Sequence, residues 1–439
     1  MLSDVRPLRD LCSLIADCPH STPVWTDSGF LVIRNQNIKS GRLDLSSPSF
    51  TDAAHFAHRT RRAKPSEGDI IFTREAPMGE VCMIPKGFEC CVGQRQVLLR
   101  PNPDVVDGRY LLYALQSPQV QHEISWNEGT GSTVSNVRIP VLEALKIPTP
   151  SIEVQRDIGS LLGALDERID LLRKTNTTLE SIAQGLFKSW FIDFDPVRAK
   201  VEGREPEGMD AETARLFPDA LDTWLQSCRR VSVSDAVSSR TLLIGDGYRA
   251  KNSELGYPGI GFVRAGDLLN GCITPTEDFL SMTALDKAKS KMAKAGDTAF
   301  TSKGTIGRFA YVDSDAGDAV YSPQVCFWRS LNSTELHPAF LHFWMKSRLF
   351  SAQVDMVRGQ AAIMDFVSLS DQRRMLLDMP PCAVQQRFSE IVQPILTRIS
   401  GNRTAASILI DLRDTLLPRL ISGKNRPTEL AAELNEVSA

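Results

Sequence analysis

Residues 151–191 read SIEVQRDIGSLLGALDERIDLLRKTNTTLESIAQGLFKSWF, and this stretch decides how the chain folds. Apolar side chains recur in it at alternating steps of three and four residues. The positions are Leu162, Leu165, Ile169, Leu172, Asn176, Leu179, Ala183, Leu186 and Trp190, of which only Asn176 is polar. Charged residues fill the flanks, which is typical of a helix in a coiled coil. A helix of about 40 residues would be roughly 60 Å long, so its narrow apolar stripe needs a second long helix as cover.

A second stretch with the same pattern begins near residue 385. Moving the first pattern by 230 residues gives Val392, Ile395, Ile399, Asn402, Ala406, Leu409, Arg413, Leu416 and Leu420, seven of which are apolar. Prolines stand ahead of both stretches, at 148 and 150 and at 380 and 381. Pro394 lies inside the second stretch and is expected to kink that helix or delay its regular start, and Gly401 adds a weak point.

The similarity between the two halves extends upstream of these helices. FLVIRNQNI (30–38) resembles IGFVRAGDL (260–268), and GDIIFTREAPMG (68–79) resembles GDTAFTSKGTIG (296–307). GQRQVLL (93–99) aligns with SPQVCFW (322–328), YLLYALQSP (110–118) with FLHFWMKSR (340–348), and Gln155-Arg156 with Gln386-Arg387. The matches come in one order at offsets of 228 to 231 residues, which predicts a tandem duplication.

The duplication predicts the domain plan. Short apolar runs bounded by glycine turns indicate strands, and these alternate with short helices in both halves. The expected segments are a first globular unit (1–150), a long helix (151–195), a linker (196–231), a second globular unit (232–382), a second long helix (383–423) and a polar tail (424–439). The fold class is therefore α/β (α+β), with two tandem units whose helices pair as an antiparallel coiled coil about a pseudo-twofold axis.

Composition excludes several classes of protein. The 439 residues are 42% hydrophobic and 23% charged, as in ordinary globular proteins. No apolar run approaches the roughly 20 residues that span a bilayer, and the N-terminus does not resemble a signal peptide, so we expect a cytoplasmic protein. The nine cysteines form no CxxC pair, which predicts free thiols and no zinc site.

Motifs that would indicate catalysis are absent from the sequence. It has no glycine-rich loop ending in Gly-Lys-Ser or Gly-Lys-Thr, no Asn- or Asp-Pro-Pro-aromatic motif and no acidic residue or glutamine two positions before a lysine. The six histidines show no metal-ligand spacing. We therefore expect a non-catalytic chain without a metal or cofactor of its own.

The chain resembles the DNA-specificity subunit of a type I restriction-modification system over essentially its whole length. The motifs that carry the resemblance are LFKSWFIDFDPVRAK (186–200) and AETARLFPD (211–219) in the middle and LLPRLISG (416–423) at the end. DCPHSTP (17–23) and VIRNQNIKSG (32–41) resemble the opening of that family's first recognition domain. The family's P-x-G-W boundary before the second domain is missing, since residues 224–228 read WLQSC.

The resemblance implies a reader of double-stranded DNA. Each globular unit would read one half of a bipartite, asymmetric site, and the paired helices would fix the spacer between the halves. Expected partners are two methyltransferase (M) subunits, which bind S-adenosylmethionine, and restriction/translocase (R) subunits, which use ATP and Mg²⁺. Those cofactors would belong to the partners, and no membrane partner is expected.

Candidate DNA-contacting residues are chosen by chemistry, since Arg and Lys suit guanine edges and Asn and Gln suit adenine edges. In the first half they are Arg34, Asn35, Arg59, Arg61, Arg62, Arg74, Gln94 and Arg95. In the second half they are Arg264, Lys303, Arg308, Gln324 and Arg358. The loops around Gly131-Ser132 and Gly359-Gln360 stand at matching positions and could bring backbone close to DNA. The alternative for each residue is a surface ion pair or a turn.

The seam residues of both helices, together with Phe191 and Phe194, are expected to form the coiled coil and to dock partners. Trp190, Phe191 and Phe194 are either core residues at the helix end or a docking patch for the methyltransferase. Asn176 either sets the register of the seam or leaves a water-exposed gap.

Two other functions compete with DNA reading. A coiled-coil adaptor that joins two proteins would explain the helices and the formal net charge of −3, but not the duplicated globular units. A self-contained modification or cleavage enzyme is disfavoured by the missing motifs.

Overall fold

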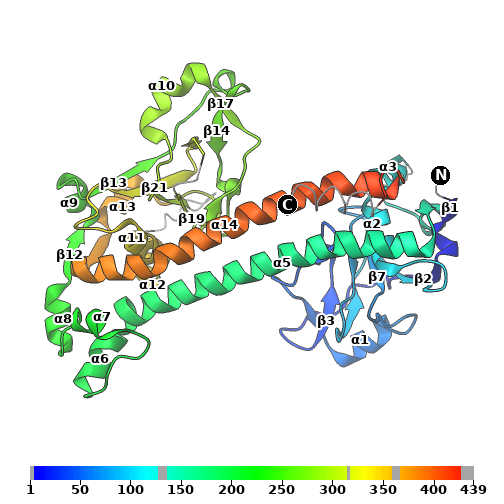
Figure 1. Ribbon diagram of the computed structural model, residues 1–439, viewed down its shortest axis with the longest axis horizontal. Coiled ribbons are helices and arrows are strands. Elements are labelled where there is room, and N and C mark those ends of the chain that lie inside the picture. Colours follow the sequence, from blue (N-terminus) through cyan, green and yellow to red (C-terminus); the bar gives the residue numbers. More distant parts are fainter. Residues whose placement is uncertain (1–3, 127–135, 314–316, 358–365, 427–439) are drawn as a thin grey trace. The chain divides into compact units, whose positions relative to one another are not determined.

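The computed structural model describes residues 4–126, 136–313, 317–357 and 366–426 (Figure 1). Contacts divide the chain into a first unit, Met1–Leu172 with Ala405–Ala439, and a second unit, Arg173–Thr404. Two long helices, α5 (Ile152–Lys188) and α14 (Cys382–Ile421), contribute residues to both units. No helix among the described residues has the length and apolarity that a membrane span requires.

The first unit is built on two small sheets. The larger is antiparallel and has the order β2 (Cys12–Asp17), β10 (Gln96–Pro101), β7 (Ile70–Thr73), β8 (Val81–Met83). The other has the order β6 (Phe50–Thr51), β3 (Phe30–Ile33), β9 (Cys90–Val92), with β3 and β9 parallel. Two pairs complete it, β1 (Asp4–Pro7) with β11 (Lys146–Thr149) and β4 (Ile38–Lys39) with β5 (Arg42–Leu43). Its short helices are α1 (Ala53–Arg59), α2 (Gly108–Gln116), α3 (Pro118–Trp126) and α4 (Ile139–Ala144).

The second unit repeats this topology strand for strand. Its larger sheet has the order β13 (Leu242–Asp246), β21 (Val325–Ser330), β18 (Thr298–Thr301), β19 (Phe309–Tyr311). The three-stranded sheet has the order β17 (Phe279–Ser281), β14 (Gly259–Val263), β20 (Ala319–Tyr321), with β14 and β20 parallel. The pairs are β12 (Arg229–Ser232) with β22 (Leu376–Met379) and β15 (Leu268–Leu269) with β16 (Cys272–Ile273), and the helices are α9 (Val233–Ser238), α10 (Leu285–Ala288), α11 (Pro338–Met345), α12 (Arg348–Val357) and α13 (Leu369–Arg374). The predicted mixed fold of two similar units is confirmed.

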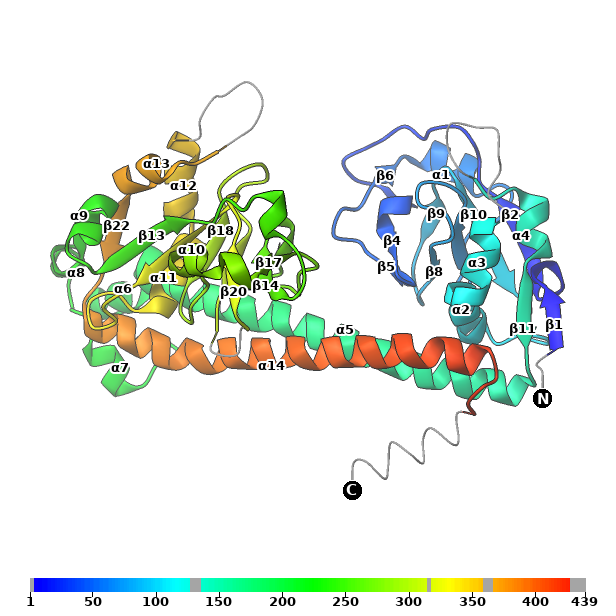
Figure 2. The same ribbon diagram turned by 90° about the horizontal axis from the view of Figure 1, so that it is seen from above.

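The core of the first unit uses residues from both ends of the chain. Helix α2 lies beside β8 (Figure 2) and buries Tyr110 and Leu111 against Phe72. Leu416 and Leu420 at the end of α14 belong to the same buried cluster. The last turns of the second long helix therefore complete the core of the first unit.

Within each unit, α5 and α14 pack in opposite directions, as the heptads predict. In the first unit, Asp166 pairs with Arg413, and Ile169 packs with Ala406 further along. In the second unit the partner of Asn176 is Asn402, and the ring of Phe187 meets that of Phe388. As the residue number rises in α5 it falls in α14, which is antiparallel pairing.

The expectation that Pro394 delays the second helix is wrong. Helix α14 is helical from Cys382, well before the proline. Pro394 and Glu390 are both exposed. Water can therefore solvate the Glu390 carbonyl, which lacks an amide donor because proline has none.

Asn176 is hydrogen-bonded across the seam and does not lie in a gap. Its Nδ2 donates to the carbonyl of Ile399 at 3.1 Å, and its Oδ1 accepts from Asn402 Nδ2 at 2.8 Å. Asn402 is buried. A buried polar pair of this kind favours the one register in which both amides find partners.

Residues 189–231 are folded against the second unit. After α5 come a π-helical turn (Ser189–Asp193), α6 (Asp195–Val201), α7 (Ala211–Arg215) and α8 (Leu221–Ser227). Trp190, Phe217 and Trp224 are almost fully buried in one cluster. Phe191 is 8% exposed, and the half-buried Phe194 packs against the cluster. The rings of Trp190 and Phe191 are core, so they offer no docking surface in this chain.

We expect Asn176→Leu or Asn402→Leu to lower the free energy of unfolding by about 1–3 kcal/mol, because each leaves a buried amide without its partner. The double variant should be at least as stable as either single variant, since it leaves neither amide behind. Urea unfolding of the full chain measures this, with Gln184→Leu on the exposed face of α5 as the control. Additive losses in the double variant would contradict a coupled pair.

Candidate nucleic-acid interface and its attachment to the helices

An arginine and a tryptophan form an exposed stack beside the three-stranded sheet of the first unit. Arg34 follows β3, and its guanidinium carbon lies 4.9 Å from the centre of the Trp25 ring. Trp25 is 44% exposed, and Arg34 is exposed as well. The guanidinium has one further contact, a 3.4 Å hydrogen bond to Ser49 Oγ. Arg34 is thus oriented while its remaining donors face solvent.

Three other candidates of the first unit are held by the protein itself. Gln94 Nε2 donates to the His20 carbonyl at 2.6 Å and to Thr22 Oγ1 at 3.0 Å. Asn35 donates to the Glu75 carbonyl and accepts from Gln96. Arg74 pairs with Asp17 at 2.9 Å and donates to the Val137 carbonyl. These residues shape the turns around them.

Arg59 was predicted to contact DNA, and the structure does not support that role. Its side chain is 2% exposed and donates to the carbonyls of Val92, Ser21 and Pro19. A guanidinium that is buried and satisfied by backbone cannot reach a base edge. Arg59 instead fixes the loop that precedes Trp25.

The remaining arginines of the first unit are exposed. Arg61 and Arg62 follow α1, and Arg62 has one weak contact, 3.5 Å to the Asp17 carbonyl. Arg95 occupies a left-handed backbone conformation with φ 68° and pairs with Glu75 at 3.1 Å. Gly131 and Ser132 lie outside the described residues, as do Arg358 and Gln360 in the second unit.

The second unit places its candidates on the corresponding turns. Arg264 pairs with Asp278 and lies over the Phe262 ring at 5.6 Å. Lys303 is half-buried, and its backbone pairs with that of Phe366. Arg308 is exposed and reaches the Ala265 carbonyl at 3.5 Å. Gln324 is exposed, and its Oε1 accepts from Ser322.

The sequence analysis missed an exposed aromatic residue in each unit. Trp25 precedes β3, and Tyr257, which is 83% exposed, precedes the equivalent strand β14. Aromatic rings of this kind can stack on bases. The signal in the sequence was an aromatic residue among turn-forming residues just before the same strand in both repeats.

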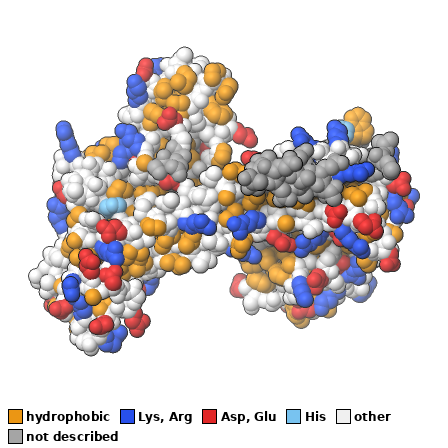
Figure 3. Space-filling view, viewed as in Figure 1, with side chains coloured by type: hydrophobic (Ala, Val, Ile, Leu, Met, Phe, Trp, Pro, Cys, Tyr) orange, Lys and Arg blue, Asp and Glu red, His pale blue; other side chains and the backbone are white. Residues whose placement is uncertain are grey.

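Charge does not mark the interface. On the face drawn in Figure 3, basic and acidic side chains are interspersed over the described residues. Several candidate arginines already have acidic partners, as described above. Contacts to DNA through this chain would therefore depend on a few oriented side chains.

A network of charged groups attaches the first unit to its helices. Asp166 on α5 accepts from Arg42 on β5 at 2.6 Å, from Tyr113 on α2 at 2.6 Å and from Arg413 on α14 at 2.8 Å. Arg42 also pairs with Asp170. Burial favours the neutral form of Asp166, but these three donors outweigh it, so the pKa of the carboxyl lies below its ordinary value.

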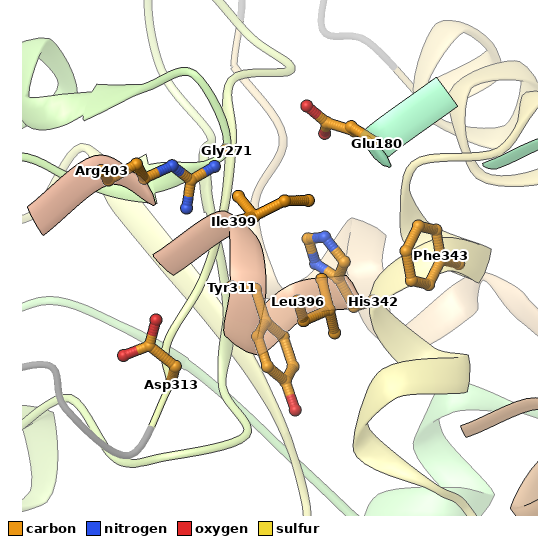
Figure 4. A pocket seen from close by; sticks show the side chains of 9 residues that line it. All are labelled: Glu180, Gly271, Tyr311, Asp313, His342, Phe343, Leu396, Ile399 and Arg403. Atoms are coloured by element: carbon orange, nitrogen blue, oxygen red, sulfur yellow. The ribbon is translucent and has the colours of Figure 1, made fainter. Parts of the chain in front are cut away.

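The second unit is attached by different residues at an equivalent place. Lys346, at the end of α11, pairs with Glu180 on α5, and Arg403 on α14 donates to the Asn270 carbonyl between β15 and β16. Figure 4 shows Glu180 and Arg403 among the residues that line a small hollow here. Its volume of about 20 Å³ has room for a single water molecule. The hollow is too small to bind a substrate.

Metal and thiol chemistry have no site among the described residues. No group of three His, Cys, Asp or Glu side chains there could hold a metal ion. The nine cysteines are free. Burial raises the pKa of Cys12 to about 12, and burial also raises that of Cys91 to about 11, so these thiols are protonated at neutral pH.

Comparison with known proteins identifies the class. Residues 5–181 match the family described as the type I restriction modification DNA specificity domain. The type I restriction enzyme MjaIX specificity subunit of Methanocaldococcus jannaschii is 27% identical, covering 83% of this chain and 79% of that protein. The HindI specificity subunit of Haemophilus influenzae is 24% identical, covering 82% and 86%.

A solved structure agrees with this class at the level of the fold. The crystal structure of a type I restriction-modification S subunit from M. genitalium matches with a TM-score of 0.55 at 16% identity, covering 95% of this chain and 96% of that one. The chain is a duplicated recognition protein with paired long helices. It belongs to the family of type I restriction-modification specificity subunits.

Asp166→Asn should lower the free energy of unfolding at pH 7 by about 1–3 kcal/mol, because three donors lose a charged acceptor. A carboxyl whose pKa is depressed on folding contributes stability above its unfolded pKa and loses it as pH falls through the folded pKa. The difference between wild type and variant should therefore shrink below about pH 4. Urea midpoints from pH 7 to pH 3 measure it.

Glu167→Gln is the matched control for this measurement. Glu167 is one residue further along α5 and also pairs with the globular part, through Arg109 at 2.9 Å, but the pair is exposed. Exposed pairs contribute little. A wild-type-to-Asp166→Asn difference that stayed constant down to pH 3 would contradict the proposed electrostatic role.

Proposed function

We propose that this chain reads a bipartite, asymmetric site in double-stranded DNA for a type I restriction-modification complex, with each unit reading one half. The observation that supports this most directly is the duplicated topology with exposed polar and aromatic side chains on corresponding turns. A duplicated fold gives two readers, and sequence divergence between them gives two different half-sites. Arg34, Arg62 and Arg95 are the proposed contacts of the first unit, and Arg308 and Gln324 those of the second. Arg59 is no longer a candidate.

In this proposal α5 and α14 set the distance between half-sites. Helices of 37 and 40 residues would each extend about 55–60 Å if straight. In DNA-binding proteins with two readers, half-site spacing follows from the separation of the readers. Both helices contribute to both units, so a change in helix length would change that separation.

The proposal assigns all catalysis to partner subunits. Methyltransferase subunits would bind S-adenosylmethionine, and restriction/translocase subunits would use ATP and Mg²⁺. Leu171 on α5 and Ile408 on α14, 53% and 61% exposed, belong to the first unit and support docking of a partner on the helices. A chain that acts only as an adaptor would use the same residues without contacting DNA.

We expect Arg34→Ala to weaken binding of the selected duplex by about 1–3 kcal/mol and to relax one base position. A residue that contacts phosphate, as we propose for Arg62, should weaken all sequences alike and reduce the salt dependence. Binding-site selection from a random duplex pool, followed by anisotropy titrations with and without methyltransferase partners, separates the two. Arg109→Ala, which removes an exposed arginine at the start of α2, is the control. No selected sequence in either condition would favour the adaptor.

We also expect spacer length to follow helix length. Seven residues inserted after Leu172 and seven after Thr404 add about 10 Å, or about three base pairs. Those base pairs rotate one half-site by roughly 100° about the DNA axis, so binding should weaken sharply. Twenty-one residues in each helix add about 32 Å, close to one DNA turn, and should restore binding with a spacer about nine or ten base pairs longer. Recovery of the original spacer at full affinity would contradict the proposal.

A further inference from the structure

A buried glutamine stands in the first turn of each long helix. Gln155 in α5 is 1% exposed. Its Oε1 accepts from the backbone N–H of Asp107 at 2.9 Å, and its Nε2 donates to the Pro150 carbonyl at 2.9 Å. Asp107 caps the start of α2. The amide therefore links the first turn of the long helix to the helix that packs on the sheet.

Gln385 in α14 makes the same contacts in the second unit. It is fully buried, and its Oε1 accepts from the backbone N–H of His337, the residue before α11, at 3.0 Å. Its Nε2 donates to the carbonyls of Pro380 at 2.8 Å and Glu335 at 3.1 Å. Each acceptor or donor stands 230 residues after its counterpart, apart from Glu335, which is an added contact. The alignment of Gln155 with Gln386 is thus wrong by one residue, because Gln386 is exposed and bonds to Glu390.

These contacts lie at the joint between the globular part and the helix. In the first unit the chain passes from β11 to α5 through only Pro150 and Ser151. A Cβ added at Gly159, one turn further, would lie 2.9 Å from Asp107 Oδ1 and 3.1 Å from the Tyr110 amide nitrogen. The start of α2 therefore lies directly against α5, and the glutamine fixes that approach through directional hydrogen bonds.

Packing alone does not require a glutamine here. An unbranched apolar side chain would fill a similar volume, whereas a buried amide needs partners for both its donor and its acceptor. The same side chain with the same partners in both units indicates a geometric requirement common to both. That requirement is the direction in which the long helix leaves the globular part.

We propose that Gln155 and Gln385 are positioning residues that fix the angle between each recognition unit and the helix that follows it, and thereby the spacer length that the chain accepts. This inference rests on the proposed function. With the joint loosened, each unit would still read its half-site, but half-sites at neighbouring spacings would become acceptable. Base preference and spacer preference should therefore separate.

The test compares Gln155→Met and Gln385→Met, which keep an unbranched side chain and lose both hydrogen bonds, with wild type. Gln386→Met is the matched control, because it makes the same change one residue away on the exposed face. Each full-length chain, with its methyltransferase partners, selects sites from a random duplex pool. Anisotropy titrations then compare the favoured spacer with spacers one base pair shorter and longer.

We expect both buried-site variants to select the wild-type half-site bases while discrimination between adjacent spacers falls about tenfold, as the loss of two hydrogen bonds allows. The double variant should discriminate less than either single variant, and Gln386→Met should match wild type. Variants that lose thermal stability but keep the wild-type spacer discrimination would overturn the inference and leave the proposed function intact. A wild-type chain that selected no bipartite site would overturn both.

If a methionine variant fails to fold, Gln155→Glu and Gln385→Glu take its place. Glutamate retains the acceptor for the Asp107 or His337 amide and loses only the donor. Its effect on spacer discrimination should be smaller and in the same direction. Unchanged discrimination in folded glutamate variants would again overturn the inference.

Discussion

Neither repeat can bury its long helix alone, and the rest of the structure depends on this constraint. The apolar stripe of α5 is too narrow to serve as the core of one small unit, so it packs against α14 in both units. The antiparallel direction carries Leu416 and Leu420 into the first core and leaves Phe187 and Trp190 in the second. Each core is thus completed by the end of the helix that belongs to the other repeat, which couples the folding of the two repeats.

Polar contacts define the geometry that apolar packing leaves open. Leucine and isoleucine seams tolerate shifts of register, whereas the Asn176–Asn402 and Asp166–Arg413 pairs each exist in one register only. The attachment of sheet to helix follows the same principle with different residues. The first unit uses Arg42 and Asp166, while the second uses Lys346 and Glu180. Only the glutamines at the joints are the same in both units.

Sequence periodicity predicted the helices, the duplication and the fold class because burial imposes those patterns on every residue. It could not place individual polar side chains. Arg59 lies three residues after Phe56 on α1, and that spacing puts both on the buried face. Gln385 likewise shares the face of Phe388 and Val392, a signal that distinguishes it from Gln386. Pro394 was misjudged because its cost depends on whether the freed carbonyl meets solvent, which periodicity does not report.

The near-neutral charge of the chain is consistent with the way its arginines are used. Arg74, Arg100 and Arg329 pair with acidic residues within the units, and Arg59 is satisfied by backbone, so few cations remain to meet phosphates. Non-specific affinity for DNA comes mainly from such phosphate contacts, and it is strongly salt-dependent. Discrimination between sequences needs only a few oriented donors and acceptors at base edges. If the chain reads DNA as proposed, most of the affinity would come from partner subunits, while this chain supplies the choice of sequence and the spacing between half-sites.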